Sequence, residues 1–238
     1  MSQREADAVA PKSRRDTIYA RPGTSDEDAL REVLIDCCYE ERDLGFTVDE
    51  GETWLDLGAN IGAFAIFCRR RSARAECFEP DPDCFALLQK NAPGFALHRA
   101  AVTNRHEPTL PFRKSPNPNN HWRATAADAP GLVEHPAGAL PNLHGAFLKE
   151  RTYDGVKMDI EGAEAGLILD GLLPRANKLV FEFHFSRLGR DLGLFFAVVD
   201  RLGDRFARTA YPASIDADRT GGTYTGDADS LVFAWEPL

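Results

Sequence analysis

The 238-residue sequence has neither a long apolar segment nor an excess of basic charge. No stretch approaches the roughly 18 apolar residues that a membrane span needs, and the polar N-terminus has no apolar core of a signal peptide. We therefore expect a cytoplasmic protein that does not enter a membrane. The formal net charge is −9, whereas binding to a nucleic-acid backbone needs a basic face. We therefore expect no nucleic-acid partner.

Cysteine is present in a pattern that does not fit the usual cysteine frameworks. The five cysteines are odd in number, and no C-x-x-C pair occurs among them. A disulfide scaffold or a zinc site is therefore not expected, and we expect no metal site. The thiols are best interpreted as small apolar side chains. They are Cys37, Cys38, Cys68, Cys77 and Cys84.

The sequence also lacks G-x-G-x-x-G, the glycine spacing expected for a dinucleotide site. Residues 53–67 offer a different loop. A mainly apolar run leads to Asp56, a loop with Gly58 and Gly62 follows, and apolar positions at helical spacing start at Ile61. This pattern predicts a strand, a tight turn and a helix. Glycine in the turn allows close approach of a ligand to the backbone, and helix N–H groups would face that ligand. A side chain at Gly58 is therefore expected to block binding and leave the fold intact.

A second acidic residue follows at a distance that fits a ribose site. Residues 75–78 form a short apolar strand that ends at Glu79, 23 residues after Asp56. An acidic residue at about 20 residues from the first strand can accept hydrogen bonds from a ribose diol. The sequence therefore predicts a cofactor that contains ribose.

The start of the chain divides into an arm and a helix. Residues 1–16 are charged and alanine-rich without periodicity, which predicts a disordered arm before a single domain of residues 17–238. Ser25 is a candidate N-cap for a helical segment of residues 25–40, with Asp26 in its first turn. We expect this segment to lie across the mouth of the cofactor site.

Strand and helix patterns alternate through the remaining chain. Asp81 and Pro82 are suited to begin the second crossover helix. Further strands are predicted at 96–102, 154–160, 178–183, 205–211 and 231–235, of which the last two form a closing hairpin. This alternation predicts a three-layer α/β fold. Residues 106–140 are rich in proline and have little periodicity, so we expect a long substrate-side insertion there.

Three separated segments resemble the FkbM family of methyltransferases. They are residues 21–26, residues 54–62 together with 78–80, and residues 156–164. The glycine loop, Asp-Leu-Gly-Ala-Asn-Ile-Gly, is similar to that of many class I methyltransferases. The Lys-Met-Asp-Ile-Glu-Gly-Ala-Glu segment, residues 157–164, is the specific part. The resemblance extends from about Arg21 to Phe185, and the insertion departs from it.

The resemblance implies a class I, Rossmann-like, three-layer methyltransferase fold with a mostly parallel seven-stranded sheet and a C-terminal antiparallel hairpin. It implies S-adenosyl-L-methionine as cofactor and O-methylation of a hydroxyl on a small molecule, of the natural-product or sugar type. The acceptor and the oligomeric state stay open. The residues expected to bind the cofactor are Asp56, Gly58, Asn60, Gly62, Glu79, Pro80, Ser25, Asp26 and Val102.

Asp159 and His184 are the candidate catalytic residues. They follow the fourth and fifth strands, and ligands of parallel sheets bind at the carboxyl ends of strands. Alternation places Lys157 on the face of Asp159, and Glu182 on the face of His184. With the two strands in register, Lys157 would pair with Glu182, and Asp159 with His184. A histidine held by a carboxylate can act as a base near neutral pH. One alternative is a hydrogen bond that only stiffens the cleft. A metal-binding role is the other, but a single pair of aspartate and histidine offers too few ligands to predict a metal site, so any need for a metal stays open.

Two other functions stay open from the sequence. An NAD-dependent oxidoreductase would share the strand and helix alternation, although the absent G-x-G-x-x-G disfavours it. A non-catalytic module that binds S-adenosylmethionine would share the glycine loop but would methylate no acceptor.

Overall fold

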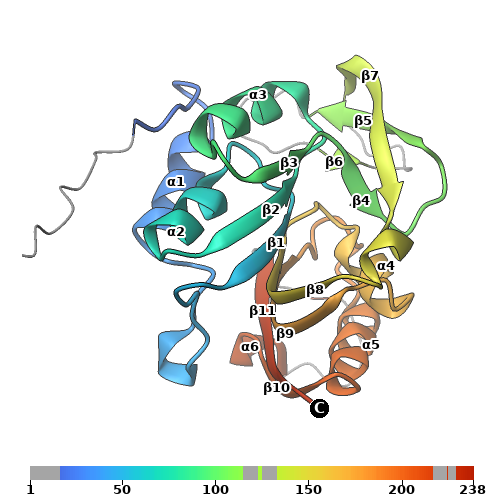
Figure 1. The fold of residues 1–238 in the computed structure, drawn as a ribbon. Helices are drawn as coiled ribbons and strands as arrows, with labels where there is room; N and C mark the ends of the chain where they lie inside the picture. The colour runs from blue at the N-terminus through green and yellow to red at the C-terminus, as the bar shows by residue number, and fades with distance from the viewer. Residues whose placement is uncertain (1–16, 115–122, 125–132, 217–223, 225–228) are drawn as a thin grey trace, which may run out of the picture.

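The structure is a computed structural model, and it describes residues 17–114, 123–124, 133–216, 224 and 229–238 (Figure 1). The predicted arm of residues 1–16 and parts of the predicted insertion, 115–122 and 125–132, lie outside the described residues. Among the described residues, no helix has the length and apolar character needed to cross a membrane.

A seven-stranded sheet runs through the middle of the molecule (Figure 1). Its strand order is β10-β11-β9-β8-β1-β2-β3. The neighbouring strands β3, β2, β1, β8 and β9 pair in parallel. β11 pairs antiparallel with both β9 and β10. The predicted mostly parallel sheet with a C-terminal antiparallel hairpin is confirmed. The strands are β1 (Thr53–Leu57), β2 (Arg74–Phe78), β3 (Ala96–His98), β8 (Thr152–Met158), β9 (Arg175–Phe183), β10 (Phe206–Ala210) and β11 (Ser230–Pro237).

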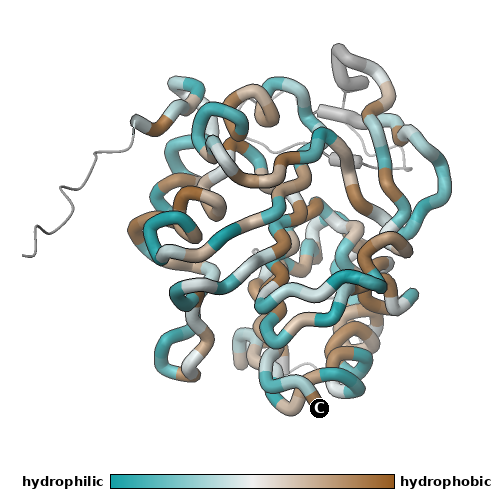
Figure 2. Tube along the Cα trace, viewed as in Figure 1, coloured by the Kyte–Doolittle hydropathy of each residue, from teal (hydrophilic) through white to brown (hydrophobic). Residues whose placement is uncertain are grey.

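Helices cover both faces of this sheet, so the fold has three layers. The clusters of buried side chains show the layers, because one holds residues of α1, α2 and α3 and the other holds residues of α4 and α5. Along β1, Trp54 belongs to the first cluster, and Leu55 and Leu57 belong to the second. Figure 2 shows apolar segments along the central strands and the helices that face them. The helices are α1 (Asp26–Leu34), α2 (Ala63–Arg70), α3 (Pro82–Asn91), α4 (Glu164–Leu169), α5 (Leu192–Gly203) and α6 (Ala213–Asp216), with short 3-10 turns η1 (Arg42–Leu44) and η2 (Gly145–Leu148).

A second, four-stranded sheet occupies the region where the sequence predicted an irregular insertion. Its order is β4-β7-β5-β6, formed by β4 (Ala101–Thr103), β5 (Thr109–Lys114), β6 (Arg123–Ala124) and β7 (Val133–His144). The predicted single strand 96–102 is wrong, because a tight turn in which Ala100 N–H donates to the His98 carbonyl separates β3 from β4. The register between β5 and β7 shifts at Pro111, a residue without a backbone donor. Prolines therefore concealed these strands.

The first helix is shorter than predicted and is held by a buried ion pair. It ends at Leu34 rather than at residue 40, and Ser25 makes no side-chain capping bond. The carboxylate of Asp26 is fully buried and accepts three hydrogen bonds from Arg21, at 2.6, 2.8 and 2.9 Å. At α3 the predicted start is confirmed, since Asp81 accepts bonds from two backbone N–H groups and Pro82 is the first helical residue.

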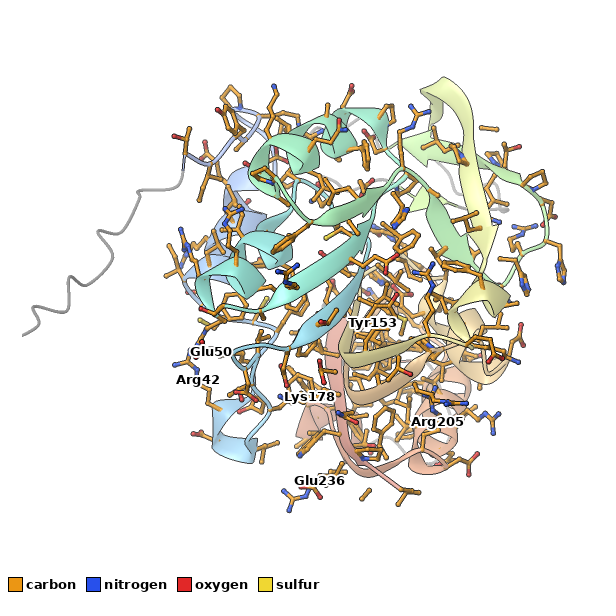
Figure 3. All side chains as sticks on the ribbon, viewed as in Figure 1. Arg42, Glu50, Tyr153, Lys178, Arg205 and Glu236 are labelled. Atoms are coloured by element: carbon orange, nitrogen blue, oxygen red, sulfur yellow. The ribbon has the colours of Figure 1, made fainter. Side chains whose placement is uncertain are left out.

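An ion-paired lysine fixes the amino end of the sheet. Lys178 of β9 is labelled in Figure 3. It donates hydrogen bonds of 2.7 Å to the Thr47 carbonyl and to the carboxylates of Asp49 and Glu52. These acceptors precede β1 in the chain. The lysine therefore connects the segment that leads into β1 with strand β9. The opposite, carboxyl ends of the strands remain for the site described below.

The turn after β1 brings two backbone segments into close approach. Gly58 has a φ of +79°, and a Cβ at this residue would lie 1.8 Å from the backbone oxygen of Asp159. Its N–H donates to the Phe78 carbonyl at 3.0 Å. The expectation that a side chain at Gly58 leaves the fold intact is therefore wrong. Glycine is required here because a side chain would collide with the Asp159 backbone.

Replacement of Gly58 by alanine tests this close approach. Gly51 is the matched control, because it has a φ of +84° with open space around its Cβ position. We expect Gly51→Ala to cost about 1–2 kcal/mol through the left-handed backbone alone. Gly58→Ala should cost about 1–3 kcal/mol more, because the carbonyl must shift. Urea unfolding measures both values, and equal losses of stability would refute the close approach.

Candidate functional site

The carboxyl ends of β1, β8 and β9 open into a cavity of about 260 Å³. The turn after β1 contributes Gly58 and Asn60, and α1 contributes Glu32 and Val33. The remaining wall comes from Tyr39, the end of β8 and the segments around His184 and Asp229. Strand ends in a parallel sheet are where ligands bind in α/β proteins, so this cavity is the candidate site.

A buried ion pair lies beneath the glycine turn. Lys157 of β8 lies opposite Asp56 of β1, and its Nζ is 3.1 Å from Asp56 Oδ1. The same Nζ donates to the Gly58 carbonyl at 2.8 Å. Burial lowers the pKa of Lys157, but the carboxylates of Asp56 and Asp159 together outweigh burial and raise the pKa above its ordinary value. The ammonium group therefore holds the turn from below.

The predicted ion pair between Lys157 and Glu182 is wrong. The register of β8 and β9 sets Lys157 opposite Val180, so Glu182 lies one step further toward the cavity. Alternation along each strand was correct, but the offset between the strands differs from the one assumed. Both Lys157 and Glu182 line the cavity, but the ion-pair partner of Lys157 is Asp56 on the neighbouring strand β1.

Asp159 lines the cavity just beyond the end of β8. Its backbone N–H donates to the Leu57 carbonyl at 3.0 Å, which continues the pairing of β8 with β1. The hydroxyl of Tyr39 donates to Asp159 Oδ2 at 3.2 Å. Burial raises the pKa of Tyr39 well above its ordinary value, so the hydroxyl keeps its proton. Tyr39 therefore orients one carboxylate oxygen of Asp159.

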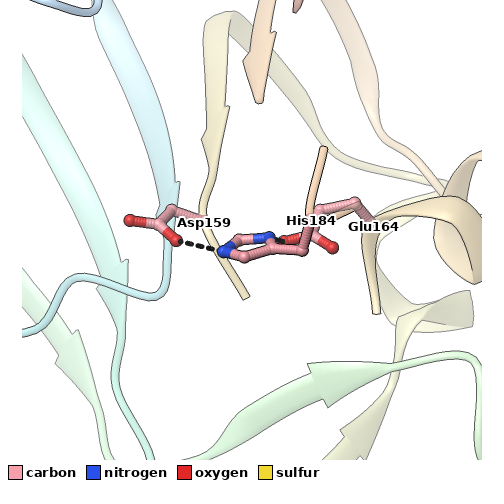
Figure 4. A group of neighbouring side chains, drawn as sticks. All are labelled: Asp159, Glu164 and His184. Atoms are coloured by element: carbon pink, nitrogen blue, oxygen red, sulfur yellow. Dashed lines mark ion pairs between the residues drawn. The ribbon is translucent and has the colours of Figure 1, made fainter. Parts of the chain in front are cut away.

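His184 lies beside Asp159, as the sequence predicted. Its Nε2 is 3.5 Å from Asp159 Oδ1, and its Nδ1 is 3.0 Å from Glu164 Oε1 (Figure 4). The Nδ1 contact lacks the angle of a good hydrogen bond, so it is an ion-pair contact. Burial lowers the pKa of His184, but the surrounding carboxylates, Glu164 first, raise it well above its ordinary value. The ring is thus a buried centre of positive charge among carboxylates.

Three further carboxylates surround the ring, of which the sequence singled out Glu182 alone, and that one as a partner of Lys157. Glu161 and Glu182 lie 3.7 and 3.8 Å from Nε2. Burial raises the pKa of Glu161 to about 8 and that of Glu182 to about 7. Glu164 is fully buried, and its two oxygens accept bonds from the N–H groups of Ile160 and Gly162 at 2.8 and 2.9 Å. Its position at the start of α4, within the specific segment 157–164, was the available signal.

Asp229 and Tyr39 carried no sequence signal of their own. Asp229 lines the cavity and accepts bonds from the backbone N–H and the hydroxyl of Ser186, at 2.8 and 2.9 Å. Tyr39 is 120 positions from its partner Asp159 along the chain. Only folding brings such distant residues together.

The residues predicted to bind the cofactor gather in part. Gly58 and Asn60 line the cavity. The carboxylate of Glu79 accepts the Asn60 N–H at 2.8 Å and the Asp81 N–H at 2.7 Å, so the end of β2 is bonded to the glycine turn. Pro80 follows directly on Glu79. Gly62 has a φ of +93°, and its Cβ position would lie 2.8 Å from Leu88, so it allows α2 and α3 to pack closely.

Of the nine predicted cofactor residues, Gly58 and Asn60 line the cavity, and the other seven, Glu79, Pro80 and Gly62 included, do not. Asp56 is buried beneath the turn against Lys157. Asp26 is buried against Arg21, and Ser25 precedes α1. Val102 belongs to β4 and to the apolar cluster under α4 and α5. For these residues the structure shows packing and ion-pair roles, and a cofactor contact stays a prediction.

A family model agrees with this site. The model described as Methyltransferase FkbM domain matches residues 56–208, which include the glycine turn, Glu79, Asp159 and His184. This interval covers well over half of the chain. No curated protein sequence matches the chain.

Several solved structures share a distant likeness. Thermoplasma acidophilum 1320 is 12% identical, with a TM-score of 0.43 over 89% of this chain and 86% of that one. A TehB-like SAM-dependent methyltransferase from Corynebacterium glutamicum is 11% identical, with a TM-score of 0.41 over 89% and 98%. M. jannaschii TYW2 in complex with AdoMet is 12% identical, with a TM-score of 0.41 over 82% and 73%. Such TM-scores are too low to support any statement on the function of this chain.

Glu79 gives the site a testable dependence on pH. Burial raises the pKa of Glu79 to about 8 from an ordinary 4.5, although the N–H groups of Asp81 and Asn60 favour the ionised form. The folded chain therefore holds a proton that the unfolded chain releases. This contribution to stability is present below pH 4.5 and is lost as the pH rises through 8. Glu79→Gln should remove that part of the decline.

Urea unfolding at a series of pH values measures the effect. The readout is the slope of the unfolding free energy against pH, because the glutamine can also change stability by a constant amount. Glu50→Gln is the control, since Glu50 is exposed and should leave the slope unchanged. Identical slopes for the parent and Glu79→Gln would contradict the raised pKa.

Proposed function

The chain belongs to the FkbM methyltransferase family and uses S-adenosylmethionine, and from this premise we propose that it methylates a hydroxyl group of a small molecule. One observation carries the proposal: the carboxylate of Asp159 lines the same cavity as the glycine turn expected to hold the cofactor. Cofactor and acceptor would then meet within one cavity. The NAD-dependent alternative loses its support, because the matching family model is that of a methyltransferase.

The residues around the glycine turn fit the cofactor. Gly58 and Asn60 line the cavity with a turn that carries no bulky side chain at its first position. Glu79 is fixed by two backbone N–H groups, which occupy two of about four lone-pair positions of a carboxylate. The others can accept the hydroxyl groups of a ribose. When bound, S-adenosylmethionine supplies an electrophilic methyl group.

The acceptor end of the cavity supports transfer to oxygen. Methyl transfer is an in-line displacement, so much of the acceleration can come from holding the acceptor in attack geometry. A hydroxyl must also lose its proton, for which a base within hydrogen-bond reach helps by about 100-fold or more. Asp159 offers a carboxylate that Tyr39 and His184 orient from two sides.

The proton acceptor is assigned to Asp159 rather than to His184. The surrounding carboxylates raise the pKa of His184 well above its ordinary value, and an imidazolium has no free lone pair to accept a proton. His184 is then a positioning residue that balances the charge of Asp159. This revises the role expected from the sequence, in which a histidine of near-neutral pKa was the base.

The size of the cavity favours a small acceptor. Its volume of about 260 Å³ is below the roughly 300–1,000 Å³ of ligand pockets, and the acceptor would share this volume with part of the cofactor. The wall includes Tyr39 and Phe64 beside the polar groups, so an acceptor with an apolar body and a hydroxyl fits it chemically. The cavity therefore favours a small hydroxylated molecule, as expected from the resemblance for an acceptor of the natural-product or sugar type.

The cofactor assignment predicts a loss of affinity in Glu79→Gln. Above pH 8, where Glu79 is ionised, removal of the charge weakens the bonds to two ribose hydroxyls, each of which contributes about 1.5–3 kcal/mol. Calorimetry should therefore show S-adenosylmethionine affinity falling at least about tenfold. Glu50→Gln, on the exposed turn before β1, should bind as the parent does. Unchanged affinity in Glu79→Gln would remove Glu79 from the cofactor site.

The role of Asp159 predicts a specific loss of turnover. With an acceptor found by screening hydroxylated compounds for release of S-adenosylhomocysteine, Asp159→Asn should lower kcat about 100-fold or more. Cofactor affinity should stay unchanged, because the residue does not face the ribose side. Asp43→Asn, an exposed change in η1, is the matched control.

Three results would count against this assignment. Near-normal turnover in Asp159→Asn would leave positioning alone as the mechanism. A product methylated on nitrogen would reject the hydroxyl acceptor. Tight cofactor binding with no methylated acceptor across the screen would favour the non-catalytic binding module.

A further inference from the structure

Side chains able to bind a metal ion gather around His184. These side chains form two groups that share His184. Within each group, the ligand atoms lie within 4.8 Å of one another. One consists of Asp159, Glu164 and His184, and the other of Glu182, His184 and Asp229. Four of these five residues line the cavity, and Glu164 lies behind the ring. The sequence argument for no metal site considered only a single pair of aspartate and histidine.

The carboxylates surround Nε2 of His184 without binding it closely. The distances from Nε2 to Asp159, Glu161 and Glu182 are 3.5, 3.7 and 3.8 Å. A charged N–H donor normally approaches a carboxylate oxygen to about 2.7–2.9 Å. Nδ1 also makes no hydrogen bond of good geometry, and only 4% of the side chain is exposed. A buried imidazole without a well-formed hydrogen bond on either nitrogen is rare, because buried polar groups are normally satisfied.

The charges of the neighbouring residues leave the cavity acidic. Arg187 donates to Glu161 at 2.9 Å, and Lys157 pairs with Asp56. Within the part of the chain that the structure describes, Glu182 has no cationic partner apart from His184, and Asp229 has none. Two carboxylates thus face the cavity beside Asp159 with a single imidazole between them. A divalent cation would balance this charge.

We propose that Glu182, Asp229 and Nε2 of His184 bind a hard divalent cation of the Mg²⁺ or Mn²⁺ type. The cation takes the place of the Nε2 proton, which is released to solvent, because a metal-binding histidine must be neutral. Carboxylate oxygens predominate in the set, and oxygen ligands suit these ions. Glu164 completes the arrangement from behind, since its carboxylate is 3.0 Å from Nδ1. Metal-binding histidines commonly have a carboxylate beside their second ring nitrogen, and Glu164 occupies that position, although its contact with Nδ1 lacks the angle of a good hydrogen bond.

The cation deepens the proposed function, on which this catalytic consequence rests. A hydroxyl bound to a divalent cation loses its proton more easily, because the cation stabilises the oxyanion. The metal would then act at the acceptor end of the cavity, away from Glu79. Binding of the ion itself needs neither cofactor nor acceptor, so it can be measured separately from methyl transfer.

The test is a titration of the full chain with Mn²⁺ alone, followed by electron paramagnetic resonance. The parent protein should bind one Mn²⁺ per chain. Glu182→Gln keeps the shape of the side chain and removes its charge, so affinity should fall at least about tenfold. Glu32→Gln is the matched control, because Glu32 lines the same cavity but belongs to neither donor group. It should bind Mn²⁺ as the parent does.

Thermal unfolding provides the second measurement. Mn²⁺ should raise the Tm of the parent and of Glu32→Gln, because a ligand that binds the folded state stabilises it. The Tm of Glu182→Gln without metal shows that the variant is folded, and Mn²⁺ should raise it much less. No stoichiometric binding by the parent would overturn the proposal. Equal losses of affinity in the two variants would overturn it as well, since they would indicate unspecific attraction to an acidic cavity.

The outcomes separate this proposal from the proposed function. If Mn²⁺ does not bind but a hydroxyl is methylated, the metal site alone fails. If Mn²⁺ binds as expected but no hydroxyl acceptor is methylated, the proposed acceptor chemistry fails and the metal site stands.

Discussion

The passage of the Asp159 backbone beneath the turn at Gly58 is the constraint on which the site depends. A Cβ on Gly58 would lie 1.8 Å from the Asp159 carbonyl oxygen, so the turn and the end of β8 share one narrow space. Lys157 joins the same parts, with Nζ bonded to the Gly58 carbonyl and paired with Asp56. The glycine turn and Asp159 are therefore held at a fixed separation, and the proposed function would use this separation to hold the acceptor in attack geometry.

The electrostatics of the cavity follow from the segment 157–164, which leaves the sheet at its carboxyl edge. It contributes Lys157 beneath the turn, Asp159 and Glu161 on the wall, and Glu164 at the start of α4. Glu164 binds the N–H groups of Ile160 and Gly162, so the segment folds back on itself around His184. One short stretch thus supplies three of the charged side chains that line the cavity and places a fourth, Glu164, against the ring of His184.

The sequence predicted the main sheet well, because period-2 patterns and turn residues are local properties. The C-terminal hairpin, the start of α3 at Pro82 and the adjacency of Asp159 and His184 were all found. The sheet formed by β4 to β7 was missed, since prolines such as Pro111 interrupt the pattern by which strands are recognised. The register of β8 against β9 was also wrong, because alternation fixes the face of a side chain but not its partner.

The sequence by itself determined which residue types stand at the ends of the strands, because spacing along one chain sets Gly58, Glu79, Asp159 and His184 there. Only the tertiary structure decided what surrounds them. Tyr39 and Asp229 reach the cavity from segments far from β8 in the chain, and no local pattern encodes such contacts. The ring of carboxylates around His184 arises in the same way, since strand register and the turn into α4 set those distances.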